Sequence, residues 1–154
     1  MIRELGVNAN KFTPAYLTAA VKMTTGMGAV AGNDGTFKLP TQETADGIRF
    51  VEKEREVSGI YASQTDLDDY FKEFVTVEQG DFAKLITPMA YEVYAVDQYD
   101  TAIKESDVGK RLAVGTDGKW KVATITSRFV FNGFYQDGTH KLIEIGVMDT
   151  AASN

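Results

Sequence analysis

Asp-Gly-Thr-Phe-Lys-Leu, at residues 34–39, is a stretch that the chain uses again in altered form. It returns as Asp-Gly-Lys-Trp-Lys-Val at 117–122 and as Asp-Gly-Thr-His-Lys-Leu at 137–142. Asp-Gly supplies the positive φ angles of a tight turn, and the residues after it alternate between polar and apolar, as a strand requires. Each copy therefore predicts a β-hairpin.

The first two copies match over a longer segment, in which residue 34 corresponds to residue 117, an offset of 83. The matching residues are Gly26, Gly32, Asp34, Gly35, Lys38 and Thr41 in the first segment, and Gly109, Gly115, Asp117, Gly118, Lys121 and Thr124 in the second. Most of them are turn residues. Either an internal duplication or the shared demands of hairpin turns explains the match.

Short apolar segments separated by turn glycines continue along the chain, with a spacing of about 8–12 residues between strands. We expect an all-β fold, a small antiparallel β-barrel or sandwich built from glycine-turn hairpins. The residues expected to form most of the core or an interface are Leu112, Val114, Trp120, Val122, Phe129, Phe131, Ile143 and Ile145. Replacing Gly118 by valine should destabilise the fold by about 1 kcal/mol or more, because a β-branched residue is strained at positive φ.

A chain of 154 residues is the length of one ordinary domain. We expect an extended N-terminal arm at 1–17, a single β-domain at 18–148 and a loose C-terminal tail at 149–154. The arm is expected to lie on its own barrel or on a neighbouring subunit, a frayed terminus being the alternative. Its apolar residues, which have no periodicity, are the candidate partner-binding residues Leu5, Val7, Phe12 and Tyr16.

One segment has the period of a short amphipathic helix. Its apolar residues at i, i+3, i+4 and i+7 are Leu67, Tyr70, Phe71 and Phe74. Thr65 is the candidate N-cap, and the aspartates of 66–69 lie where the helix dipole favours carboxylates. We expect a helix that starts at Thr65 or Asp66 and buries Leu67, Phe71 and Phe74. A calcium site at the same aspartates is the competing interpretation, but the glycine and glutamate of an EF-hand loop are missing.

Composition restricts the partners and cofactors. The formal charge of −6 argues against a nucleic-acid partner and suits a basic protein partner. Because the chain has no cysteine, we expect no disulfide and no thiolate metal site. No apolar run is long enough to cross a membrane, and Met1 to Glu4 lacks the apolar core of a signal peptide, so we expect synthesis in a cytoplasm.

Candidate catalytic groups are few, and we expect neither an enzyme nor a cofactor. The single histidine, His140, replaces an aromatic strand residue, which is typical of a surface side chain rather than a catalytic base. Asp97 and Asp100 are candidates for a glycosidase carboxylate pair, although loop aspartates are common. The glycines are followed by strands, whereas a phosphate cradle needs a helix N-terminus. Trp120 and the tyrosines are candidates either for a sugar-stacking platform or for the core.

The chain resembles the head decoration proteins, also called capsid cement proteins, of tailed bacteriophages. The resemblance rests on the arm ending near Tyr16, the glycine-punctuated hairpins and the phrases at 47–51, 78–81 and 107–112. It implies a non-enzymatic virion protein that docks on the outside of an assembled capsid, contacts the major capsid protein and stabilises the joints between capsomers. Such proteins are often trimers with terminal arms that reach over neighbouring subunits.

Two other functions remain open. One is another virion or surface β-module, such as a tail, fibre or carbohydrate-binding domain. The other is a small β-barrel enzyme or ligand carrier. The lack of a catalytic constellation favours capsid decoration and the other virion or surface modules over an enzyme or ligand carrier. The N-terminal arm favours capsid decoration over a free sugar-binding module.

Overall fold

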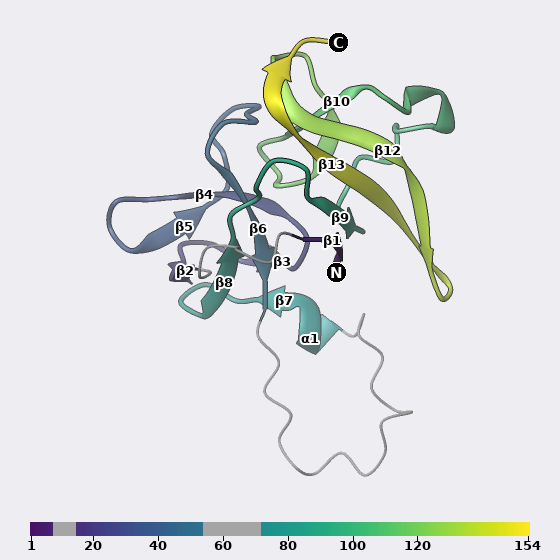
Figure 1. Ribbon diagram of the computed structural model, residues 1–154. Coiled ribbons are helices and arrows are strands. Elements are labelled where there is room, and N and C mark those ends of the chain that lie inside the picture. Colours follow the sequence, from purple (N-terminus) through teal and green to yellow (C-terminus); the bar gives the residue numbers. More distant parts are fainter. Residues whose placement is uncertain (8–14, 54–71) are drawn as a thin grey trace.

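The repeated Asp-Gly stretches lie at the turns of three antiparallel hairpins in the computed structural model, which describes residues 1–7, 15–53 and 72–154. Gly35, Gly118 and Gly138 have φ angles of 78°, 79° and 60°, in the left-handed region that favours glycine. The fold is mainly β, which confirms the predicted class (Figure 1).

Five strands close a barrel in the order β2-β5-β4-β6-β8, which we call unit 1. They are β2 (Ala15–Ala19), β4 (Gly28–Ala31), β5 (Thr36–Lys38), β6 (Ile48–Glu52) and β8 (Phe82–Ile86). β2 and β5 run parallel, and every other neighbouring pair is antiparallel.

A six-stranded antiparallel sheet forms the rest of the fold, in the order β1-β9-β13-β12-β10-β11. Its strands are β1 (Ile2–Gly6), β9 (Val93–Val96), β10 (Arg111–Val114), β11 (Trp120–Val122), β12 (Ser127–Asp137) and β13 (His140–Ala152). The sheet curls back on itself, because Tyr99, just after β9, forms a parallel bridge with Trp120 of β11. We call β9 to β13 unit 2.

The two units have the same topology, strand for strand. In unit 1 the order β2, β8, β6, β4, β5 corresponds to β9, β13, β12, β10, β11 in unit 2, and in both the last strand meets the first in parallel. Equivalent backbone hydrogen bonds occur in both units. Gly26 N–H donates to Val51 O in unit 1 (2.8 Å), as Gly109 N–H does to Phe131 O in unit 2 (2.8 Å). Likewise, Gly32 N–H donates to Thr36 O (2.8 Å) and Gly115 N–H to Lys119 O (2.9 Å). The offset of 83 residues is therefore a structural repeat of a whole five-stranded unit, beyond shared turn chemistry.

The units differ in how their last two strands are joined. Unit 2 joins β12 and β13 through the Asp137-Gly138 turn, whereas unit 1 inserts a long segment between β6 and β8. This segment includes α1 (Lys72–Val75) and β7 (Thr76–Val77), and β7 pairs with β3 (Met23–Thr24). The predicted helix start at Thr65, with Leu67 and Phe71, lies outside the described residues. A short 3₁₀ helix (Glu105–Asp107) precedes β10.

Strand β6 separates two apolar clusters. Val51 packs inside unit 1, whereas Ile48 and Phe50, on its other face, join the cluster of unit 2, as the alternation of 48–51 predicts. The ring centroid of Phe50 lies 4.9 Å from that of Trp120. Of the predicted core residues, Leu112, Val114, Trp120, Phe129, Phe131, Ile143 and Ile145 are buried, and Val122 is partly buried. Their place in the core is confirmed, but they do not form most of it, because the cluster of unit 1 contains none of them.

The predicted boundaries at both ends need correction. Residues 2–6 form β1 beside β9, and Ile2 is only 6% exposed, so this part of 1–17 lies on its own β-domain. The α-amino group of Met1 donates to Thr25 O (2.7 Å) and forms an ion pair with Asp97. Burial lowers the pKa of this amine, and the Asp97 carboxylate opposes the shift. At the other end β13 continues to Ala152 opposite Ser127, where a loose tail from 149 was expected.

Candidate interaction site

The three candidate partner-binding residues that the structure describes belong to two different sheets. Leu5, Val7 and Tyr16 are all exposed, and Phe12 lies outside the described residues. Leu5 and Val7 lie at the end of β1, beside unit 2, whereas Tyr16 lies on β2 of unit 1, opposite Lys84. Tyr16 is therefore on a different sheet from the other two.

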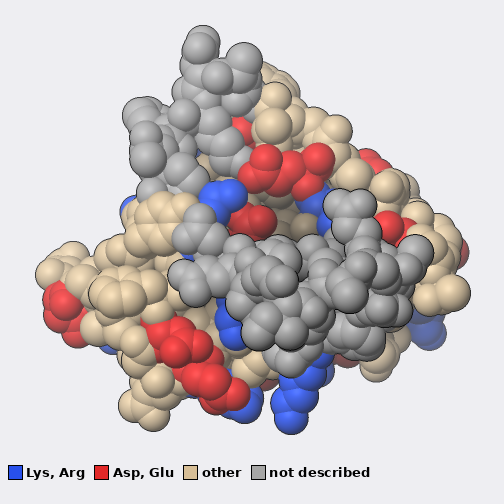
Figure 2. Space-filling model, turned by 90° about the horizontal axis from the view of Figure 1, so that it is seen from below, with Lys and Arg blue, Asp and Glu red and all other residues tan. Residues whose placement is uncertain are grey.

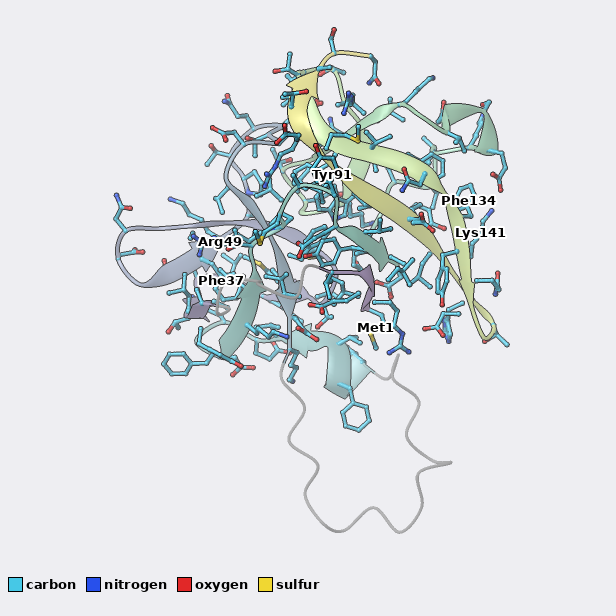
Figure 3. The ribbon with its side chains drawn as sticks, in the orientation of Figure 1. Met1, Phe37, Arg49, Tyr91, Phe134 and Lys141 are labelled. Atoms are coloured by element: carbon cyan, nitrogen blue, oxygen red, sulfur yellow. The ribbon has the colours of Figure 1, made fainter. Side chains whose placement is uncertain are left out.

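Exposed apolar residues lie on three neighbouring segments: at the end of β1, just before β9 and within β13. The ladder aligns Gly6 of β1, Val93 of β9 and Gly146 of β13. Val7 follows Gly6, Met148 lies two residues beyond Gly146, and Tyr91 comes two residues before Val93. Figure 3 labels Tyr91. Tyr91 N–H donates to Val147 O (2.6 Å), which places it next to Met148. We call Leu5, Val7, Tyr91 and Met148 the tyrosine patch.

Tyr91 has an unusual backbone conformation. Its φ angle is 69°, and within residues 1–7, 15–53 and 72–154 it is the only non-glycine residue with positive φ. It occupies the third position of a turn closed by Glu92 N–H donating to Met89 O (3.3 Å), where positive φ favours glycine. Tyr91 and Glu92 together oppose Val147, which makes a β-bulge. A bulky residue in this conformation costs roughly 1–3 kcal/mol.

Hydrogen bonds to neighbouring groups fix the turn. The buried carboxylate of Glu92 accepts from Met89 N–H (2.8 Å) and from the Tyr94 hydroxyl (2.5 Å). Burial, and then the Glu92 carboxylate, raise the pKa of Tyr94, so its hydroxyl stays a proton donor. Arg128 Nη2, from β12, donates to Pro88 O (2.7 Å). The strained residue is therefore held in place, and its side chain is 77% exposed.

The sequence hides this site because the alternation in 88–96 predicts a single strand with Tyr91, Val93 and Ala95 on one face. That boundary is wrong, since β9 begins at Val93. Pro88 could have indicated a turn, but nothing in the sequence indicates that the tyrosine in this turn has a positive φ angle. Phe82 was also missed: it begins β8 opposite Thr18 and is 73% exposed.

The candidate catalytic groups have local structural roles. Asp97 binds the Met1 amine, and Asp100 Oδ1 accepts from Ala102 N–H (2.9 Å) within a turn. His140 lies opposite Asp137 at the tip of the β12–β13 hairpin. Trp120 is fully buried, and its Nε1 donates to Gly26 O (3.1 Å), so it is a core residue and not a sugar-stacking platform.

A hollow beside β1 and the end of β6 is lined by Met1, Ile2, Arg3, Thr25, Glu52, Lys53 and Phe74. Its charged groups form bonds between strands, since Arg3 pairs with Asp137 (2.7 Å) and Glu52 with Lys84 (2.6 Å). On the face seen from below, acidic and basic side chains lie among one another (Figure 2).

Among the described residues, no group of three or more His, Cys, Asp or Glu side chains is placed to hold a metal ion. The aspartates of 66–69 lie outside this part of the chain. Within the same described ranges, no helix is long and apolar enough to cross a membrane. Comparison with known proteins gave no match to any family model, curated protein or solved structure.

Proposed function

We propose that the protein is a non-enzymatic virion component that binds the outer surface of an assembled phage capsid and stabilises the contacts between capsomers. The observation that supports this function best is the tyrosine patch. Its apolar side chains are exposed on well-braced strands and turns, whereas a small-molecule site places such side chains around a cavity.

The arrangement of the chain agrees with a binding role. Ile48, Phe50 and Ile86 of unit 1 pack in the apolar cluster of unit 2, so the two units support one another and interaction residues on their strands need little further ordering. The exposed residues Leu5 and Val7 are two of the candidate partner-binding residues of the N-terminal segment, and they belong to the patch.

Co-sedimentation tests the proposal. Purified protein is mixed with heads of the phage that encodes it, from which bound copies have been stripped, and the heads are pelleted. The protein should pellet with the heads to saturation and raise the temperature at which they rupture. Protein that stays in the supernatant contradicts the proposal, and binding to isolated tails or fibres favours the alternative of another virion β-module.

A further inference from the structure

We infer that Tyr91 is the anchor of the capsid contact, inserting into an apolar recess with a basic rim on the partner. This inference rests on the function proposed above, and it names the residue and the chemistry of the partner surface.

The fold does not need the tyrosine ring. Glycine suits a φ of 69° better than any residue with a side chain, and the bonds that fix the turn come from Glu92, Arg128 and the backbone. The ring is 77% exposed, and its hydroxyl has no hydrogen-bond partner in the described parts of the chain. Because the strained conformation of Tyr91 is not offset by contacts of its ring within the fold, we infer that the ring has a role in binding.

The position suits an anchor for a protein partner. Tyrosine provides a large amphipathic surface with few rotatable bonds, and the braced turn holds it before contact, so little entropy is lost on binding. Met148, beside it, is an adaptable apolar neighbour, and Leu5 and Val7 extend the patch along β1.

The charges next to the patch indicate the partner's chemistry. Glu4 and Asp149 are the sequence neighbours of Leu5 and Met148, and both are exposed. The cation Lys84, near Glu4, already pairs with Glu52 (2.6 Å). The nearby cation Arg128 is held by Pro88 O and lies 5.6 Å from the centroid of the Phe129 ring. The chain carries a net charge of −6. A second copy would bring like charges together, and nucleic acid or an anionic membrane would be repelled, so a basic protein surface fits best.

Two variants at one position test the anchor. Tyr91→Gly removes the ring and relieves the strain, whereas Tyr91→Ala removes the ring and keeps the strain. Both should weaken binding to stripped phage heads by on the order of ten-fold or more. Tyr91→Gly should melt at or above the wild-type temperature, and Tyr91→Ala below Tyr91→Gly. The matched control is Phe82→Ala, an equally exposed aromatic in unit 1, which should bind as the wild type does.

Each failure has a distinct pattern. Wild-type protein that does not bind heads overturns both proposals. Tyr91 variants that bind like the wild type, or a Phe82 variant that loses as much affinity, overturn the anchor alone. Variants that lose stability like core substitutions also overturn it, because the ring would then belong to the fold. Raising NaCl from about 50 mM to about 500 mM should weaken wild-type binding several-fold, and unchanged binding overturns the basic rim.

Discussion

At the residue scale, the two repeated turns give the same glycine different surroundings. Gly35 and Gly118 have nearly identical φ angles of 78° and 79°. A Cβ on Gly35 would meet nothing within 4 Å, whereas one on Gly118 would lie 2.7 Å from Leu39 Cδ2 and 3.2 Å from Met27 Sδ. The turn at Gly118 therefore packs against unit 1, whereas the equivalent turn at Gly35 does not contact the other unit at this position.

Alanine at the two positions should therefore have unequal costs. Gly35→Ala should lower the free energy of unfolding by about 1–2 kcal/mol, from backbone strain alone. Gly118→Ala should cost about 1–3 kcal/mol more, because Leu39 and Met27 must also move. Chemical denaturation of both variants measures the difference, and the larger loss expected for Gly118→Val follows the same reasoning. Equal losses would show that Leu39 and Met27 adapt without cost.

Glu43 gives the fold a pH-dependent contact. Its carboxylate accepts from Thr124 N–H (2.7 Å) and Thr124 Oγ1 (2.9 Å) and pairs with Lys121 Nζ (2.8 Å). Burial alone would raise the pKa of Glu43, but the bonds from Lys121 and Thr124 outweigh it and hold the pKa below the usual 4.5. Because the folded pKa is depressed, the stabilisation is present above pH 4.5 and is lost as the pH falls through the folded pKa.

Glu43→Gln should cost about 1–2 kcal/mol at neutral pH, since charged hydrogen bonds are replaced by neutral ones. The cost should shrink as the pH is lowered from about 6 to about 3, because the wild-type carboxyl then becomes protonated as well. Denaturation midpoints across this range measure it. Glu105→Gln, at an exposed carboxylate, is the control and should show no such trend. A difference that stays constant with pH would mean that charge is not what Glu43 contributes.

At the element scale, β1 is part of the fold and also carries exposed patch residues. Ile2 is 6% exposed in the cluster of unit 2, whereas Leu5, in the same strand, is exposed. Ile2→Ala should lower the free energy of unfolding by about 2–4 kcal/mol, and Leu5→Ala by less than about 0.5 kcal/mol. Thermal melts of the two variants compare them. A similar, small effect for both would show that β1 is dispensable.

The pairing of β1 with β9 changes the expected effect of removing residues 1–16. As an independent arm, residues 1–16 could be removed with little effect on the melting midpoint. The structure places β1 and the start of β2 within that stretch, so we now expect the truncated protein to be clearly destabilised. Point variants in the patch are therefore the better test of binding.

The sequence predicted the hairpins and the core for one physical reason: Asp-Gly turns and period-two alternation are local signals. It did not predict β1, because one buried residue in five carries no visible period and the strand exists through its pairing with β9. The patch was half predicted. Leu5 and Val7 stood out as apolar residues without a period, whereas Tyr91 and Met148 join them only through register.

At the scale of the whole molecule, the two units fill their interiors differently. Small side chains line unit 1 at positions where unit 2 has large ones: Ala19, Ala29 and Ala83 correspond to Tyr99, Leu112 and Ile143. Met23 of β3 and Val77 of β7 join the cluster of unit 1, and β7 lies in the segment inserted between β6 and β8. Val77 from the insertion and Met23 from the β2–β4 connection thus fill volume that the alanines leave, as dense packing requires.

The two units should unfold together, because residues of unit 1 pack in the apolar cluster of unit 2 and hydrogen bonds join the units. Gly28 N–H donates to Gly118 O (2.9 Å), Thr44 and Val114 exchange hydrogen bonds of 3.0 and 2.8 Å, and Trp120 Nε1 donates to Gly26 O.

Leu85→Ala, deep in unit 1, should cost about 2–5 kcal/mol and lower the melting midpoint by about 2–4 °C for each kcal/mol. The fluorescence of Trp120, the single tryptophan, reports on unit 2, whereas far-UV circular dichroism reports on both units. The two probes should shift equally, because unit 2 cannot keep Trp120 buried once Phe50 and Gly26 have left. A Trp120 transition that stays at the wild-type temperature while circular dichroism splits into two steps would show two independent domains.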